Sequence, residues 1–239
     1  MIEVLAYHSC PTDLIITTRN TRFLASIGIQ TGCDTPVINS SKTMENLKSH
    51  ITKYAVQCGF DLVRVAGSEE FVQERDVALN RIRAGHMKGL HWFTESRVRR
   101  GANPETLLPG ARSIICLGLS YLDEQADELI PSSTGKVARY ALVKDYHRTM
   151  KRRMKAFVRG LEQHLETQLE AKWYVDDGPM LDRAAAARSG LGWFGKNTNI
   201  LTSSHGSWIL LGQVITNLEL EVDSPLKKTC GTVSYTHLR

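Results

Sequence analysis

The hydrophobic positions of the chain first become regular after Met44. Between Met44 and Cys58 apolar side chains recur every three or four residues, which predicts one buried face of a helix. Gly59 follows directly, as a glycine at a helix C-terminus commonly does. The next residues, FDLVRVAG, form a short apolar run typical of a strand. The pattern therefore predicts a helix and then a strand at the beginning of an organised domain.

The same two patterns alternate along the rest of the chain. Helical spacing predicts helices over residues 71–82 and from Tyr140 to about Glu170, whereas residues 124–136 are polar and predict a loop. Strands are predicted by three apolar runs, namely SIICLGLSYL after a Pro-Gly turn, KWYV, and GSWILLGQVITNLEL. Strands that alternate with helices predict an α/β (α+β) fold in which a mixed sheet is flanked by helices.

Composition narrows the class of protein. Of the 239 residues, 42 % are hydrophobic and 23 % are charged, as in ordinary globular domains. No apolar run is long enough to span a bilayer and no secretory signal is visible, so we expect a cytoplasmic protein. The five cysteines are widely spaced and odd in number, which argues against a disulfide framework. The net charge of +5 leans weakly towards a polyanionic partner.

The stretch WYVDDGPMLDR holds the most distinctive polar residues, Asp176 and Asp177, before a Gly-Pro pair. Proline in a first turn predicts a helix from Met180 to about Ser189, with Asp177 or Gly178 as its N-cap. On one interpretation Asp177 caps this helix and Asp176 only flanks it. On the other, Asp176 gives or takes a proton at the mouth of a site. A helix N-terminus would lower the pKa of Asp176, whereas burial and a second carboxylate would raise it.

Three glycines follow the predicted helix, in RSGLGWFGKNTNIL. Gly190, Gly192 and Gly195 would let the backbone approach a ligand closely or adopt a positive φ. Their spacing matches neither the phosphate-binding loop nor the dinucleotide fingerprint. We expect a thin wall behind Asp176 that accommodates a broad, flat cofactor, and a glycine-rich turn before a strand is the alternative.

Basic residues gather in two segments. The first, ESRVRRGANPETLLPG, carries Arg97, Arg99 and Arg100, which could pair with phosphate or carboxamide groups or lie in a solvated loop. The second is the long helix, for which an RNA-facing surface and a solvated outer face are both open. The histidines are scattered, so a mononuclear metal site is not indicated. The predicted core stripe of the long helix is Tyr146, Met150, Met154, Phe157 and Leu161.

Four segments together resemble the epoxyqueuosine reductase family. They are RVRRGANPETLLPGARSIICLGLSY, GKVARYALVKDYH, VDDGPMLDRAAAARSGLGWFGKNTNIL and the closing KKTCGT. The resemblance covers residues 44–232. It implies a cobalamin-dependent iron–sulfur enzyme that reduces an epoxide on the modified wobble base of tRNA to the cyclopentene, in the last step of queuosine synthesis. tRNA is then the partner, and we expect a monomer with no membrane association.

The resemblance also implies roles for single residues. It places the family's proton donor at Asp176. Contacts to cobalamin are implied for Asp176 itself, for Arg99 and Arg139, for the backbone around Asn197 that includes Ile200, and for the backbone around Leu211.

Cys230 matches the first cysteine of the ferredoxin-type run that binds the family's two [4Fe–4S] clusters. Val233 stands at the next expected position and no further cysteine follows, whereas each cluster needs four ligands. We therefore expect residues 44–229 to form the cobalamin-binding catalytic domain and residues 230–239 to be a truncated start of the ferredoxin-type domain with an atypical tail. Residues 1–43 are expected to be a poorly organised N-terminal extension, native or not, and the chain is expected not to load its clusters.

Two other functions stay open. A corrinoid-dependent reductase related to reductive dehalogenases would share the cofactors, although such enzymes usually carry an export signal and none is visible here. A non-catalytic corrinoid-binding or RNA-binding module would use the same domain without its chemistry.

Overall fold

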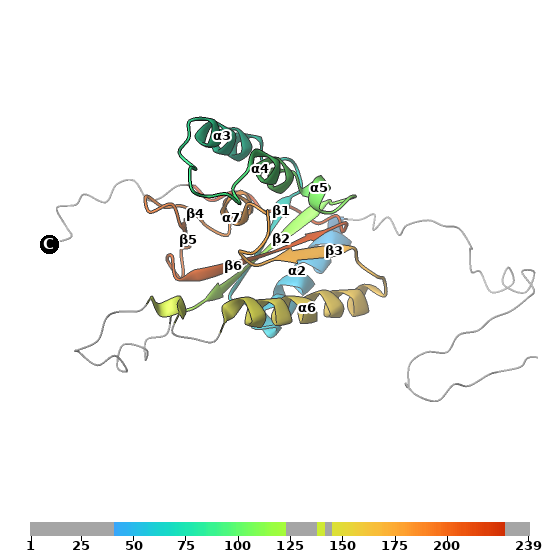
Figure 1. Cartoon of the computed structure of the whole chain (residues 1–239). Helices are drawn as coiled ribbons and strands as arrows, with labels where there is room; N and C mark the ends of the chain where they lie inside the picture. The colour runs from blue at the N-terminus through green and yellow to red at the C-terminus, as the bar shows by residue number, and fades with distance from the viewer. Residues whose placement is uncertain (1–40, 123–137, 142–144, 228–239) are drawn as a thin grey trace, which may run out of the picture. The chain divides into compact units, whose positions relative to one another are not determined.

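The structure, a computed structural model, describes residues 41–122, 138–141 and 145–227. Four strands in these residues form one sheet in the order β1-β2-β6-β3 (Figure 1). Each neighbouring pair is antiparallel. The α/β class with a sheet flanked by helices is confirmed, although we expected a mixed sheet. The strands are β1 (Leu62–Gly67), β2 (Ser113–Ser120), β6 (Ile209–Thr216) and β3 (Ala171–Tyr174).

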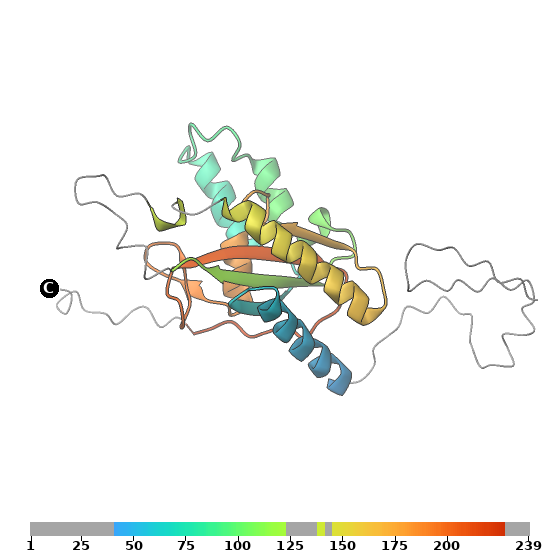
Figure 2. The same ribbon diagram turned by 90° about the horizontal axis from the view of Figure 1, so that it is seen from below.

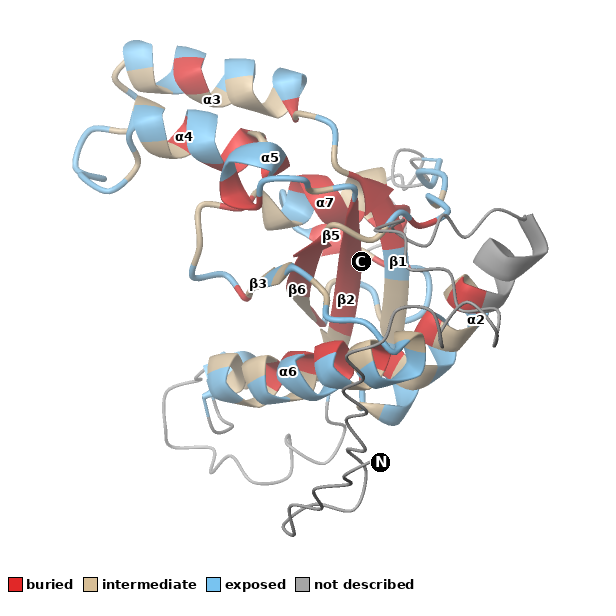
Figure 3. Cartoon of the chain, turned by 90° about the vertical axis from the view of Figure 1, so that its right-hand side faces the viewer, coloured by how far each residue is buried: buried red, intermediate tan, exposed pale blue. Residues whose placement is uncertain are grey.

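The central strand β2 contributes to a separate core on each face of the sheet. Its side chains alternate, so that Ile115 and Leu117 pack in one buried cluster and Ile114 and Cys116 in the other. All four residues are at most 1 % exposed, and β2 is coloured as buried along most of its length in Figure 3. The continuous apolar run SIICLGL is explained by this burial on both faces.

Two helices cover one face of the sheet, α2 (Ser41–Gln57) and α6 (Tyr146–Leu165) (Figure 2). Four members of the predicted stripe of α6 are confirmed, since Met150, Met154, Phe157 and Leu161 are buried, whereas the fifth, Tyr146, is only partly buried. The predicted bounds of this helix were wrong. Residues Arg139–Ala141 form a separate 3-10 turn, η2, and the helix ends before Glu166, whose backbone is left-handed at φ 50°. A left-handed residue ends a helix because it turns the chain away from the helical path.

The other face carries shorter helices (Figure 1). They are α3 (Val72–Arg83), α4 (Glu95–Ala102), α5 (Pro104–Leu107) and α7 (Asp182–Arg188), and a small hairpin of β4 (Trp193–Phe194) and β5 (Ile200–Leu201) follows α7. Three of the four alanines of α7, Ala184, Ala185 and Ala186, are buried and let this helix approach the sheet closely. Helix α4 was not predicted, because ESRVRR was interpreted as a loop. Thr94 caps it by accepting a hydrogen bond from the backbone N–H of Arg97 at 3.2 Å.

Some of the remaining predictions are confirmed, and others concern residues that the structure does not describe. The helix after Met44, the helix near residues 71–82, and the strands β1, β2, β3 and β6 are confirmed. The polar loop predicted over residues 124–136 and Cys230 lie outside the described residues. None of the described helices has the length and apolar character that a membrane span requires.

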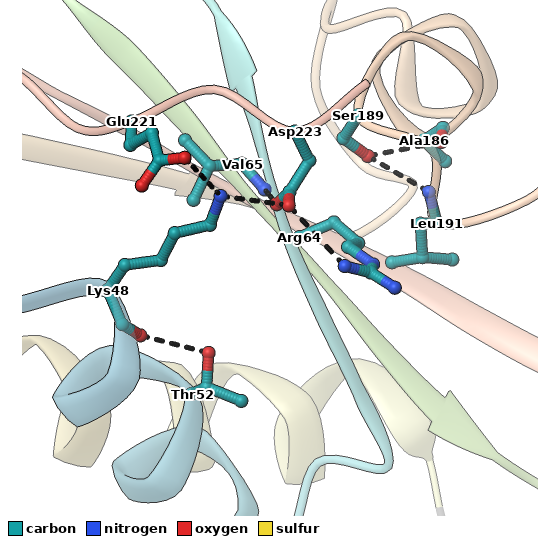
Figure 4. A network of polar contacts seen from close by, with 9 residues as sticks. All are labelled: Lys48, Thr52, Arg64, Val65, Ala186, Ser189, Leu191, Glu221 and Asp223. Atoms are coloured by element: carbon teal, nitrogen blue, oxygen red, sulfur yellow. Dashed lines mark hydrogen bonds and ion pairs between the residues drawn. The ribbon is translucent and has the colours of Figure 1, made fainter. Parts of the chain in front are cut away.

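The segment after β6 closes the open edge of β1 (Figure 4). The backbone N–H of Asp223 donates to the carbonyl of Val65 at 2.9 Å, and Asp223 Oδ2 accepts from the Val65 N–H at 2.8 Å. Asp223 Oδ1 pairs with Lys48 at 2.9 Å and with Arg64 at 3.4 Å. One carboxylate therefore occupies the exposed hydrogen-bonding edge of the sheet and connects it to α2.

Replacement of Asp223 by alanine is expected to lower the free energy of unfolding by about 1–3 kcal/mol, because the buried Val65 N–H loses its acceptor. Urea unfolding measures the change. The matched control is Glu221→Ala, since Glu221 lies 3.8 Å from Lys48 and is largely exposed. The control should change stability by less than about 0.5 kcal/mol. Equal losses in the two variants would contradict the role of Asp223.

Candidate active site

The double-aspartate loop, residues 175–181, is held on one side by α4. Arg97 Nη2 donates to the carbonyl of Gly178 at 2.5 Å, and its guanidinium lies over the ring of Trp92. Gly101 allows the closest approach, because a Cβ at this position would lie 1.8 Å from the carbonyl oxygen of Pro179. The loop therefore rests directly on the backbone of α4, and only glycine fits at the contact.

Helix α6 holds the other side of the loop. Tyr146 Oη donates to Asp176 Oδ2 at 3.2 Å, and Lys151 pairs with Asp177. Burial acts to raise the pKa of Asp177, but hydrogen bonds from Lys151 and from the Val175 N–H outweigh it and leave this pKa lowered. Burial, followed by the charge of Asp176, raises the pKa of Tyr146 to about 12, so the phenol keeps its proton and donates it.

The structure corrects the assignment of Asp177 as a helix cap. Helix α7 begins at Asp182, its N-cap position is Leu181, and no side chain caps it. Asp177 instead folds back to accept the N–H of Val175 at 3.2 Å. Asp176 has a left-handed backbone, with φ of 55°, and its side chain is exposed beside Tyr146.

Asp176 lies at a cavity of about 1030 Å³. Its walls come from α3, the double-aspartate loop, α7, the segment 194–200 and β6. The charged residues among the lining are Glu74, Arg81, Asp176, Asp182 and Arg183, and the aromatic ones are Phe93, Tyr121, Tyr140, Tyr146 and Phe194. An apolar, aromatic wall with a few polar groups is typical of a small-molecule site.

Two carboxyls of this cavity were missed by sequence reasoning, Glu74 and Asp182, and Asp182 is the more deeply buried of them. Its Oδ1 atom is buried without a hydrogen-bond partner among the described residues, although the residue as a whole is only partly buried. Burial, followed by the charge of Asp176, raises the pKa of Asp182 to about 7. The sequence offered one signal, an acidic residue in the first turn of an alanine-rich helix.

The other predicted site residues lie at different distances from the cavity. Ile200 and Leu211 are among its lining residues. Asn197 stands next to the lining and accepts the Asn199 N–H at 3.2 Å. Two predicted contacts are not among the lining: Arg99 is exposed on α4, where it pairs with Glu95 at 3.3 Å, and Arg139 lies over the ring of Trp208.

The three glycines allow neighbouring segments of the chain to pack closely against each other. A Cβ on Gly192 would lie 2.4 Å from Ile200 Cγ2, and one on Gly195 would lie 2.8 Å from the side chains of Asn197 and Leu201. Gly190 ends α7 with a positive φ of 70°. None of the three is among the residues that line the cavity, so the expected thin wall behind Asp176 is not what these glycines provide.

The fold and the site define an α/β domain with carboxyl groups at a large, partly apolar cavity. A family model described as "Epoxyqueuosine reductase QueG, DUF1730" matches residues 101–177. An epoxyqueuosine reductase from Synechococcus sp. (strain RCC307) is 38 % identical over 191 residues, which are 78 % of this chain and 57 % of that protein. The chain belongs to the epoxyqueuosine reductase family.

Solved structures of the family share the fold. An epoxyqueuosine reductase bound to an epoxyqueuosine-modified stem loop of a tyrosine tRNA is 30 % identical, with a TM-score of 0.68 over 80 % of this chain and 50 % of that one. The enzyme from Bacillus subtilis, described with its aspartate-bearing catalytic loop swung out of the active site, is 29 % identical, with a TM-score of 0.69 over 80 % and 50 %. The chain spans about half the length of the curated relatives it matches.

Proposed function

We propose that this chain is the cavity-bearing part of an enzyme that reduces epoxyqueuosine in tRNA to queuosine, with cobalamin bound in the cavity and Asp176 as the proton donor. The observation that carries the proposal is the position of Asp176 at a cavity of about 1030 Å³, hydrogen-bonded to the phenol of Tyr146. The family, and the stem loop bound to one relative, support epoxyqueuosine as the substrate.

The cavity fits a large, flat cofactor. Its volume is at the upper end of the range of about 300–1,000 Å³ that is usual for small-molecule sites. Tyr121, Tyr140, Phe194 and Leu211 offer rings and apolar surface to a macrocycle. Ile200 and Leu211 would hold cobalamin in this way, and the contacts of Arg99, Arg139 and the Asn197 backbone remain predictions. When bound, cobalamin supplies the electrons of the reduction.

The protein's own part of the reaction is the delivery of protons. Removal of the epoxide oxygen as water takes up two electrons and two protons, and negative charge develops on the oxygen as its bond to carbon breaks. Asp176 gives a proton to that oxygen. The phenol of Tyr146, which donates to the Asp176 carboxyl in the structure, would stabilise the carboxylate that the transfer leaves behind.

The loop that carries Asp176 is suited to this role because its two halves are held differently. Gly178 and Pro179 rest on α4, whereas the Asp176 side chain is exposed and bonds to Tyr146 at 3.2 Å. In the Bacillus subtilis relative the aspartate-bearing catalytic loop is described as swung out of the active site. We infer that Asp176 can likewise move while the other half of its loop stays fixed.

The iron–sulfur clusters do not fit the described residues. The cysteines described there are Cys58 and Cys116, and Cys116 is fully buried in the core. No group of three or more histidine, cysteine or acidic residues in the described ranges could hold a metal ion. Cys230 lies outside these ranges. We derive no step of the reaction through a cluster.

A direct assay tests the proposed function. A full-length protein that contains this chain, supplied with cobalamin and a reductant, should convert epoxyqueuosine in a tRNA stem loop to a nucleoside that lacks one oxygen atom, as measured by mass spectrometry. Removal of halide from a halogenated phenol, with the nucleoside unchanged, would contradict the proposal and favour a dehalogenase-like reductase.

A basic stripe on α6 is the surface we propose for tRNA phosphates. Arg148, Arg152, Lys155 and Arg159 are exposed, and their spacing of four, three and four residues places them on one face of the helix. This face is opposite the buried stripe that begins at Met150. Aligned cations on an exposed helix suit the regular charges of a nucleic-acid backbone.

The variant Arg152→Gln, Lys155→Gln is expected to weaken binding of a tRNA stem loop and to flatten its salt dependence. The plot of log affinity against log salt should lose about 1 in slope for each phosphate contact removed. Lys53→Gln is the control, because Lys53 is an exposed cation on α2. An unchanged slope in the double variant, or an equal change in the control, would exclude the stripe as the tRNA surface.

A further inference from the structure

We propose that Asp182 is a second proton-holding carboxyl of the cavity and that it passes its proton to Asp176 after Asp176 has given up its own. The inference rests on the proposed function, since it concerns the second proton that epoxide reduction consumes. In the transfer, a proton leaves the Asp182 carboxyl and arrives on the Asp176 carboxylate through water in the cavity that both residues line, and no electrons move.

The backbone of Asp182 is fixed where its side chain faces the same cavity as Asp176. Gln213, which is fully buried on β6, donates from Nε2 to the Asp182 carbonyl at 3.3 Å. At the other end of α7, Arg188 donates to the carbonyls of Glu69 and Glu70 at 2.5 and 3.3 Å. The short helix is thus attached at both ends, and its first side chain stays in the cavity wall.

The buried position of the Asp182 carboxyl favours its protonated form over its ionised form. Its Oδ1 has no partner among the described residues, and the one hydrogen bond that favours the ionised form comes from its own backbone N–H, so that burial of the charge is costly. A neutral carboxyl gains a donor of its own, and the buried Oε1 of Gln213 is a second acceptor without a partner in the described residues. The geometry therefore favours the protonated form before any charge is considered.

The charges that face Asp182 act in the same direction. Burial is the largest cause of its raised pKa, and the charges of Asp176 and Asp177 add to it. A hydrogen bond from its own backbone N–H and the charge of Arg183 oppose them, and the pKa stands at about 7. Glu74 and Arg81 face the same cavity from α3 with opposite charges.

The neutral neighbours of Asp182 add no charge. Tyr146 on α6 has its pKa raised to about 12, and the buried thiol of Cys116 on β2 also has its pKa raised to about 12. Two carboxyls with different environments in one cavity are a common arrangement for acid and base roles. Asp182 then stores a proton at neutral pH, while Asp176 at the exposed rim transfers protons from Asp182 to the substrate.

The stoichiometry of the reaction requires a second proton, and Asp182 is its source in this proposal. Epoxide reduction to an alkene consumes two protons, and one carboxyl can carry one of them. Transfer from Asp182 leaves a buried carboxylate, but it also neutralises Asp176, which removes the second-largest cause of the raised pKa of Asp182. Water that enters through the cavity then returns a proton to Asp182.

Titration of the chain itself tests the inference without any cofactor. Infrared difference spectroscopy between about pH 5 and pH 9 should show a protonated carboxyl that is lost near pH 7. This signal should be absent in Asp182→Asn. In Asp176→Asn it should persist but titrate at lower pH, because the charge that opposes ionisation is gone. A titration near pH 7 that survives in Asp182→Asn, or that Asp176→Asn leaves unmoved, would overturn the proposal.

Stability provides a second readout that a failed activity assay cannot affect. The folded-state pKa of Asp182 lies above its unfolded value, so its contribution to stability is present at low pH and is lost as pH rises through about 7. Asp182→Asn should remove this pH dependence, and above pH 7 it should melt no lower than the parent chain. A pH dependence of melting that Asp182→Asn leaves unchanged would count against the proposal.

Kinetics of the full-length enzyme then separate the inference from the proposed function. Asp182→Asn should lower turnover by about tenfold or more, leave KM for tRNA unchanged and remove the fall in rate above about pH 7. Asp182→Glu should restore part of the rate. Parental turnover and an unchanged pH profile in Asp182→Asn would overturn the inference. Failure of the parent enzyme to reduce the epoxide would count against the proposed function alone, since the titration decides the behaviour of Asp182 independently.

Discussion

Replacement of Asp176 by asparagine is expected to lower the turnover of epoxide reduction by about 10²–10⁴-fold in a full-length enzyme, the range for the loss of a positioned acid. Asparagine has nearly the same shape as aspartate and tolerates the same left-handed backbone, with φ of 55°. Its side chain can still contact Tyr146, but it cannot carry a proton to the leaving oxygen. Single-turnover measurement of queuosine formation isolates this step from binding.

The neighbouring carboxyl provides a matched control for this variant. Asp177 pairs with Lys151 and accepts the Val175 N–H, and it does not line the cavity. Asp177→Asn keeps the shape of that contact and should slow the reaction far less than Asp176→Asn. Cobalamin binding, followed by absorbance, should be the same in the two variants. Unchanged turnover in Asp176→Asn would remove the proton-donor role, and equal losses in both variants would point to the loop as a whole.

Replacement of Gly101 by alanine is expected to destabilise the chain by on the order of 3 kcal/mol, near the upper end for overpacking. A Cβ at this position would lie 1.8 Å from the carbonyl oxygen of Pro179, and backbone on both sides leaves no flexible side chain to move away. Either α4 or the double-aspartate loop must shift. Because the loop carries Asp176, turnover should fall with stability. Urea unfolding and single-turnover kinetics measure the two effects.

The control for Gly101→Ala lies on the same helix. Arg99→Ala removes an exposed side chain that pairs with Glu95, and surface pairs of this kind contribute little. It should change the free energy of unfolding by less than about 1 kcal/mol. If Gly101→Ala were as stable and as active as the parent, the direct contact between α4 and Pro179 would be refuted.

The sequence predicted elements best where burial follows a regular period. The stripe of α6 at Met150, Met154 and Phe157 and the continuous apolar run of β2 both result from packing against the sheet, and both were identified. Helix α4 was missed because arginines dominate its eight residues and only a few positions of it are buried. The start of α6 was misplaced because Tyr140 continues the apolar spacing although η2 and α6 are separate elements.

In the site, too, residues in a local sequence motif were predictable, whereas residues whose role depends on tertiary structure were not. Asp176 was identifiable because two adjacent aspartates before Gly-Pro form an unusual local motif. Asp182 was not, because its raised pKa comes from burial and from the charges of Asp176 and Asp177, which depend on how the chain folds. The glycines were given a role in the cavity wall, whereas Gly192 and its neighbours pack against β5.

The left-handed backbone at Asp176 limits which amino acids can replace it. Glycine, asparagine and aspartate adopt that conformation with little strain, whereas β-branched and bulky residues do not. Aspartate is the only member of this small group with an ionisable side chain. The left-handed backbone and the acid–base chemistry therefore both favour aspartate at this position. Glutamate has the same functional group, but it is disfavoured in the left-handed conformation.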